Sequence, residues 1–220
     1  MEAQIRCPEN CQPNVLVNAE TKLRNETEYG ALGIYLGRIL KEEIPAIQGI
    51  DKDRDKLKQL SAAIATTGMT NMFKIGLTSQ KTTEKITVET KDLKGTVEEL
   101  STAKDKKPDL VFIGCPHCSI KEMRKIAKAV KGKKVKSGIE FWVCTSCHVG
   151  EETSEYIRQI EKCGGHVLTG VCTVVSFTEK LGIKTMMTNS AKTAYYAPTL
   201  SKAEATLAPI EQCLKTALKS

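Results

Sequence analysis

From residue 109 onward, short apolar runs alternate regularly with segments of helical pattern. The strand-like runs are 109–113, 139–143, 166–169 and 184–187. The helix-like segments are 119–131, 151–163, 190–196 and 202–218. Ser119, with Glu122 three residues later, forms the capping-box signature of a helix start. This alternation predicts an α/β fold with parallel, doubly wound sheets flanked by helices.

The first half of the chain contains similar segments. We expect strands at 14–17, 71–77 and 85–90, and helices at 28–40, 53–67 and 92–101. Three glycines, Gly30, Gly33 and Gly37, would be costly inside an isolated helix. They indicate either close approach of another backbone or a loop that enters a helix beside a ligand. The polar stretch 103–108 predicts a boundary between two lobes, 1–107 with the glycine-rich helix and 108–220 with the cysteines.

Composition narrows the class of protein. The chain has 220 residues, nine cysteines and a net charge of +7. No apolar run approaches the ~18 residues of a membrane helix, and the amino terminus lacks the apolar core of a signal peptide. We therefore expect a cytoplasmic protein that does not bind a membrane. No aromatic residues interleave with the lysines, so we expect no nucleic-acid partner, and the charge suits a small anionic substrate.

Cysteines recur directly after the predicted strands of the second half. Cys115, the pair Cys144 and Cys147, and Cys172 all occupy such positions, and Asn189 begins a fourth post-strand loop. Ligands of open parallel sheets bind at the carboxyl ends of the strands, so these loops should share one edge. In a reducing cytosol, clustered thiols indicate metal, redox or nucleophilic chemistry. A metal or iron–sulfur site is the first hypothesis. Two further cysteines, Cys163 and Cys213, fit helical packing positions, and Cys7 and Cys11 have no assigned role.

The two Cys-x-x-Cys motifs suggest an alternative. Cys115, Cys118, Cys144 and Cys147 could hold zinc in a non-catalytic α/β protein, because paired motifs of this kind are typical of zinc sites. Each motif, however, begins where a strand enters a helix, so the two cysteines of a pair need not face the same metal. The segment 144–148 also matches the haem-attachment pattern, which normally accompanies export and ranks below zinc.

Four segments, in this order, resemble a known family, the aconitase X large subunit. They are 28–37, 114–122, 170–175 and 187–198. The stretches Gly114-Cys115-Pro116-His117 and Thr188-Asn189-Ser190-Ala191-Lys192 carry most of the specificity. The family includes archaeal phosphomevalonate dehydratase and bacterial cis-3-hydroxy-L-proline dehydratase. The resemblance covers nearly the whole chain and implies an aconitase-like fold.

The resemblance also implies a site. Family members are hydro-lyases with a [4Fe-4S] cluster on three cysteines, whose open iron acts as a Lewis acid on the substrate. By position, Cys115 and Cys172 would be two ligands, and His117, Asn189, Ser190 and Lys192 would line the substrate side. The third ligand is expected outside this chain, with Cys118, Cys144 or Cys147 as less favoured substitutes. The catalytic residues stay unassigned.

The resemblance further implies partners and a reaction. The family's large subunit is substantially longer than this chain, and its first cluster cysteine lies in the amino-terminal half. The expected partners are therefore a small swivelling-domain subunit and, if the amino-terminal half is separately encoded, that half; the alternative is that this chain is an excised or degenerate piece of a large subunit. The expected reaction is dehydration of (R)-5-phosphomevalonate to trans-anhydromevalonate 5-phosphate in archaeal-type isoprenoid biosynthesis. The family usually has Asp-Thr before the last cysteine, where this chain has Gly170 and Val171.

Overall fold

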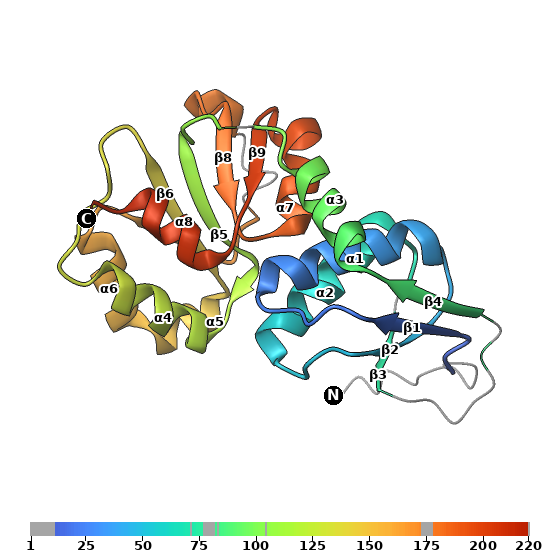
Figure 1. Ribbon diagram of the computed structural model, residues 1–220. Helices are drawn as coiled ribbons and strands as arrows, with labels where there is room; N and C mark the ends of the chain where they lie inside the picture. Colours follow the sequence, from blue (N-terminus) through green and yellow to red (C-terminus); the bar gives the residue numbers. More distant parts are fainter. Residues whose placement is uncertain are drawn as a thin grey trace.

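Two parallel β-sheets form the framework of the molecule (Figure 1). The computed structural model describes residues 12–70, 72–76, 82, 84–103, 105–172 and 178–219. The strand orders are β3-β2-β1-β4 and β7-β6-β5-β8-β9, and every strand pair within these residues is parallel. The predicted α/β fold class is confirmed. None of the helices in these ranges is long and apolar enough to cross a membrane.

The N-terminal lobe consists of the first sheet and its three helices. Its elements are β1 (Val15–Ala19), α1 (Glu26–Leu40), β2 (Pro45–Gln48), α2 (Arg54–Thr67), β3 (Lys74–Ile75), β4 (Glu84–Val88) and α3 (Thr90–Leu100). Alternate residues of β1 are buried, and all three helices contribute to one apolar cluster with β1, β2 and β4. The helices therefore cover the same face of this sheet. The strand β2 had no counterpart in the sequence-based prediction, and residues 71 and 77 of the strand expected at 71–77 lie outside the described residues.

The glycines of α1 mark close contacts between helices. A Cβ placed on Gly30 would lie 2.8 Å from the Cβ of Ala191 in the other lobe. On Gly33 it would lie 2.7 Å from the carbonyl oxygen of Leu60, and on Gly37 2.5 Å from another carbonyl oxygen of α2. Any larger side chain would push these helices apart. Of the two interpretations open from the sequence, close backbone approach is the one confirmed.

The C-terminal lobe is a sheet covered on both faces. Its elements are β5 (Leu110–Cys118), α4 (Ile120–Val130), β6 (Glu140–Thr145), α5 (Cys147–Glu152), α6 (Ser154–Lys162), β7 (His166–Thr169), a 3₁₀-helix (Thr178–Leu181), β8 (Thr185–Thr188), α7 (Ala191–Tyr196), a π-helix (Ala197–Ser201), β9 (Glu204–Leu207) and α8 (Ile210–Ala217). One face packs against α4, α6 and α8. The other packs against α7 and against residues of α1, α2 and α3. The helices of the N-terminal lobe thus lie between the two sheets (Figure 1).

Two predicted helices differ from the observed ones. The helix expected at 202–218 is wrong in its first part, where β9 pairs in parallel with β8 from Glu204 opposite Thr185 onward. The alanines and glutamate of this segment favour a helix locally, but pairing at the sheet edge buries alternate side chains and overrides that preference. The helix expected at 151–163 is divided at Thr153, so that Glu151 and Glu152 belong to the short helix α5 and α6 begins at Ser154.

Serine residues begin the helices at the carboxyl edge of this sheet. Ser119, Ser146 and Ser190 follow β5, β6 and β8, and each hydroxyl accepts a hydrogen bond from the backbone of the first helical turn. The capping box of Ser119 with Glu122 is present in both directions, as predicted. Because these strands are parallel, the loops that follow them share the carboxyl edge of the sheet.

Candidate functional site

The segment between Ile113 and Cys118 leaves the sheet. Ile113 pairs with Val143 and Cys118 with Thr145, so the connecting stretch is longer on β5 than on β6 and bulges out of the ladder. Gly114 begins this excursion with a φ of 121°. A Cβ there would lie 2.2 Å from the carbonyl oxygen of Cys144, a position that only glycine can occupy. The backbone after Gly114 is thereby directed out of the sheet at its carboxyl edge.

A shallow pocket of about 320 Å³ lies at this edge. Its lining residues come from β5 and from the loop after β7: Phe112, Gly114, Cys115, Pro116, His117, Gly170, Val171 and Cys172. Cys115 is half-buried, and Cys172 is exposed. The structure therefore brings together three of the residues singled out from the sequence, Cys115, His117 and Cys172. Residues 173–177, which follow in the 170–175 segment, lie outside the described residues.

His117 connects the two loops of this pocket. Its Nε2 lies 2.9 Å from the carbonyl oxygen of Val171. A carbonyl only accepts hydrogen bonds, so Nε2 must carry the proton and Nδ1 of the neutral ring is left as an acceptor. Because the contact uses the backbone of Val171, it does not depend on the side chain at that position. Gly170 and Val171, which stand where the family usually has Asp-Thr, are therefore compatible with this contact.

Of the remaining cysteines of the two Cys-x-x-Cys motifs, Cys118 and Cys144 are buried away from Cys115 and Cys172, and Cys147 lies beside the pocket. Cys118 is 2 % exposed and packs on one face of the sheet, and Cys144 is 1 % exposed and packs on the other. Burial raises the pKa of the Cys118 thiol well above its ordinary value, whereas a metal ligand must be a thiolate. Cys147 is exposed, and its Sγ would lie 2.8 Å from a Cβ added to Gly170 at the pocket.

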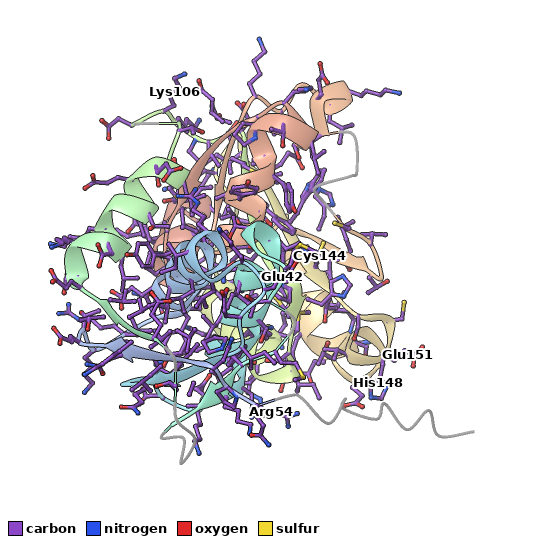
Figure 2. The ribbon with its side chains drawn as sticks, turned by 90° about the vertical axis from the view of Figure 1, so that its right-hand side faces the viewer. Glu42, Arg54, Lys106, Cys144, His148 and Glu151 are labelled. Carbon is purple, nitrogen blue, oxygen red and sulfur yellow. The ribbon has the colours of Figure 1, made fainter. Side chains whose placement is uncertain are left out.

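The four-thiol arrangement of the zinc alternative is therefore not assembled. Figure 2 shows Cys144 within the molecule and His148 near its periphery. Within the ranges that the structure describes, no group of three or more histidine, cysteine, aspartate or glutamate residues is placed to hold a metal ion. Cys163 and Cys213 are core residues, as predicted, and burial raises the pKa of both thiols. Cys7 and Cys11 lie outside the described residues.

Asn189 and Ser190 lie one strand away from the pocket that Cys115, His117 and Cys172 line, called here the thiol pocket. Because Phe112 pairs with Thr188, they follow β8 at the level where β5 reaches Gly114. Asn189 is 1 % exposed. Its Nδ2 donates to Glu26 of α1 over 3.5 Å, and its Oδ1 has no hydrogen-bonding partner among the described residues.

The other two predicted residues of this loop lie in or beside α7. The Ser190 hydroxyl accepts a hydrogen bond of 3.1 Å from the Thr193 backbone and so serves as a helix cap. Lys192 is half-buried on α7. Asn189, Ser190 and Lys192 therefore share the carboxyl edge with the thiols but do not line the thiol pocket itself.

One contributor to this edge was missed from the sequence. Lys58 of α2, in the N-terminal lobe, donates a hydrogen bond of 2.7 Å to the carbonyl oxygen of His117 and forms an ion pair with Glu122. In the sequence Lys58 lies on the polar side of an amphipathic helix and resembles a solvated lysine. Its contact with the loop of residues 114–117, called here the thiol loop, exists only because the two lobes pack together.

Comparison with known protein families gives two matches along the chain. Residues 108–219 match the model of the aconitase X third domain, and residues 13–98 match the model of the aconitase X second domain. The first match holds the thiol pocket and the second holds Lys58.

Curated relatives and a solved structure point the same way. The chain is 38 % identical over 204 residues to the phosphomevalonate dehydratase large subunit of Methanocaldococcus jannaschii, covering 86 % of this chain and 50 % of that protein. It is 30 % identical over 217 residues to a cis-3-hydroxy-L-proline dehydratase of Hypocrea jecorina, covering 88 % of this chain and 36 % of that one. The crystal structure of Thermococcus kodakaraensis aconitase X in its holo-form aligns with a TM-score of 0.85 and 28 % identity, over 96 % of this chain and 56 % of that chain. The chain spans about half the length of the phosphomevalonate dehydratase large subunits that it matches.

Proposed function

Because the chain belongs to the aconitase X family, we propose that it forms part of an iron–sulfur-dependent hydro-lyase. In this proposal Cys115 and Cys172 are two of the three thiolate ligands of a [4Fe-4S] cluster. The observation that carries the proposal is the shared pocket, which both thiols and His117 line from two separate loops. In this proposal the third ligand comes from outside this chain.

The donor set fits such a group in part. Thiolates are the usual ligands of iron–sulfur clusters, and Cys115 is half-buried and Cys172 exposed at this edge of the sheet. When bound, the cluster would supply a Lewis-acidic iron for the substrate's hydroxyl and carboxylate oxygens. Cys118 and Cys144 are poor substitutes because both are buried in apolar clusters, which leaves Cys147, among the described cysteines, as the exposed alternative ligand.

The polar residues of the same edge would bind and orient the substrate. His117 offers Nδ1 as an acceptor, because Nε2 is committed to Val171. Asn189 is buried one strand away from the pocket and keeps its Oδ1 unpartnered among the described residues, with Nδ2 directed at Glu26. An acceptor of this kind suits a hydroxyl group, and Lys192 suits a carboxylate or phosphate. The net charge of +7 also favours an anionic hydroxy acid.

For the reaction, we propose dehydration of (R)-5-phosphomevalonate to trans-anhydromevalonate 5-phosphate. Support comes from the names of several relatives, which are phosphomevalonate dehydratase large subunits. The partners would be a polypeptide equivalent to the amino-terminal half of those subunits and a small swivelling-domain subunit. We further propose a cytoplasmic location and a boundary between the two domains at residues 107 and 108.

The test is reconstitution of the assembled protein. The chain would be co-expressed with the two candidate companions, purified without oxygen and supplied with iron and sulfide. Iron and sulfide content, visible absorption and dehydration of phosphomevalonate and of cis-3-hydroxy-L-proline would then be measured. We expect cluster formation and phosphomevalonate dehydration, both reduced to background by Cys115→Ser or Cys172→Ser. Failure of the complete assembly to dehydrate either compound would overturn the proposal.

Cys147→Ser is the matched control. It removes an exposed thiol near the pocket but should leave cluster content unchanged, since the third ligand comes from a companion. The opposite pattern, with stoichiometric zinc that survives Cys172→Ser and is lost in Cys147→Ser, would instead support the non-catalytic zinc protein.

A further inference from the structure

Lys58 reaches from the N-terminal lobe to the loop that carries Cys115 and His117. Its Nζ donates a hydrogen bond of 2.7 Å to the His117 carbonyl oxygen. The same ammonium group forms an ion pair with Glu122, and the two side chains are 23 % and 11 % exposed. A pair this well shielded from water is screened less by salt than a surface pair. The interaction therefore connects the two lobes at His117 and Glu122, where the thiol loop leads into α4.

Glu122 extends this contact into the start of α4. Its carboxylate accepts a hydrogen bond of 2.8 Å from the Ser119 backbone N–H, and the Ser119 hydroxyl accepts one of 3.2 Å from the Glu122 N–H. Burial raises the pKa of the Glu122 carboxyl, and the neighbouring Lys58 ammonium opposes that effect. Lys58 thus has two connections to the short stretch 117–119, one direct and one through the helix cap.

The connection continues to the second thiol loop. The His117 ring donates from Nε2 to the carbonyl oxygen of Val171, the residue before Cys172. A single ammonium group of the N-terminal lobe therefore holds the backbone of the first loop, and a side chain of that loop holds the second. Hydrogen bonds that fix ligand-bearing segments govern how well a metal site is preorganised.

We propose that Lys58 is a positioning residue for the thiol pocket, acting through His117 and Glu122 on the loops of Cys115 and Cys172. The role deepens the proposed function and rests on it for the identity of the bound group. It makes the geometry of the thiols depend on contact between the lobes. Without Lys58 the His117 carbonyl loses its donor, and the separation of the two thiols becomes variable.

Lys121 provides a matched control. It also crosses between the lobes, with Nζ 2.8 Å from Asp53 and 3.7 Å from Asp55. Its side chain is 73 % exposed, and its ion pairs do not involve the thiol loops. Lys121→Met removes an interlobe cation without removing a donor from His117.

The first measurement uses the chain itself. Rates of iodoacetamide labelling at Cys115 and Cys172 would be followed by mass spectrometry in the wild-type chain and in the variants Lys58→Met and Lys121→Met. Losing a hydrogen bond from a charged donor should change the labelling rate of both thiols by about tenfold in Lys58→Met. Lys121→Met should stay close to the unchanged protein, and Lys58→Arg, which retains a charged donor, should recover much of the original rate.

A double variant separates positioning from general stability. Lys58→Met alone leaves Glu122 as an uncompensated buried carboxylate, whereas Lys58→Met with Glu122→Gln removes that charge and should restore the thermal unfolding temperature. Positioning predicts that the double variant still labels about tenfold differently, because the His117 carbonyl still lacks its donor. Original labelling rates in a stable double variant, or equal effects of Lys58→Met and Lys121→Met, would refute the role of Lys58.

The second measurement uses the reconstituted assembly. The lifetime of cluster absorption in the presence of an iron chelator should fall about tenfold in the double variant and remain unchanged in Lys121→Met. If the unchanged assembly binds no cluster, the proposed function fails, while the labelling comparison still decides the role of Lys58. If the cluster forms and its lifetime is the same in all variants, Lys58 does not position the thiols.

Discussion

The two Cys-x-x-Cys segments occupy equivalent places in the sheet but expose opposite cysteines. In the first, Cys115 lines the pocket and Cys118 is 2 % exposed. In the second, Cys144 is 1 % exposed and Cys147 is at the surface. Each segment lies where a strand passes into a serine-capped helix, and both strands belong to the same sheet.

The position of the capping serine explains the difference. Cys118 precedes Ser119 and still pairs with Thr145 in the sheet, whereas Cys147 follows Ser146 and is the first residue of a helix. In the first segment the backbone also leaves the ladder at Gly114, which brings Cys115 to the pocket. Equal spacing in sequence therefore does not mean equal exposure, and the backbone path decides which thiol can bind a metal.

The largest expected effect comes from removing the excursion at Gly114. Gly114→Ala combines a φ of 121° with a Cβ only 2.2 Å from the Cys144 carbonyl oxygen. Together these should lower the free energy of unfolding by about 3 kcal/mol, measured by denaturant titration. In α5, which follows the second segment, Gly150→Ala would meet the Thr169 methyl group at 2.8 Å and otherwise has ordinary contacts at 3.8 Å, and it gains helix propensity, so its effect should stay within about 1 kcal/mol. Equal costs for the two variants would remove the difference in backbone path as the explanation.

A smaller effect is expected at the second cysteine of each motif. Cys118→Ser places a hydroxyl in an apolar cluster and should cost about 2 kcal/mol of unfolding free energy. Cys147→Ser changes an exposed side chain and should stay within about 0.5 kcal/mol. Both values can be measured on the chain alone by chemical denaturation. A large cost at Cys147 would mean that its thiol has a structural partner.

The last effect appears only at alkaline pH, where stability should depend on the ionisation of Cys118. The pKa of Cys118 is raised in the folded state by burial, so the thiol ionises more readily when the chain unfolds. Its contribution to stability is complete below the pKa of the unfolded thiol, near 9, and is lost as pH rises towards the folded pKa. The loss should reach about 1.4 kcal/mol per pH unit in that window.

Variants identify the source of this pH dependence. Cys118→Ala should flatten the decline measured by denaturant titration between neutral and alkaline pH. Part of the decline should remain in this variant, because burial also raises the pKa of the Cys213 thiol. Cys147→Ala serves as the control in the second motif and should keep the decline. A decline that is unchanged by Cys118→Ala would assign it to other groups.

Most of the fold could be predicted because its local signals agree with its tertiary contacts. The capped helix at Ser119 and the strand that precedes it are specified by short-range patterns, and both are present. The segment Glu204–Leu207 could not be assigned in this way. Its residues favour a helix, and only pairing with β8 makes it a strand.

The candidate site was likewise only partly predictable from the sequence. Cys115, His117 and Cys172 could be selected from the sequence because each follows a strand or matches the family's motif, and the structure places them on one pocket. Lys58 carries no such signal, since its partner His117 is far along the chain and the contact exists only when the lobes pack.

The sequence by itself determined the alternation of strands and helices, and therefore the edge of the sheet at which the thiols gather. That follows from local hydrogen bonding and side-chain periodicity, which act over a few residues. Only the tertiary structure decided which thiol of each Cys-x-x-Cys pair reaches the surface, and that the N-terminal lobe holds the loop of Cys115 through Lys58. Exposure and interlobe contacts depend on the path of the backbone past distant segments, such as Gly114 against Cys144, and no local pattern encodes that meeting.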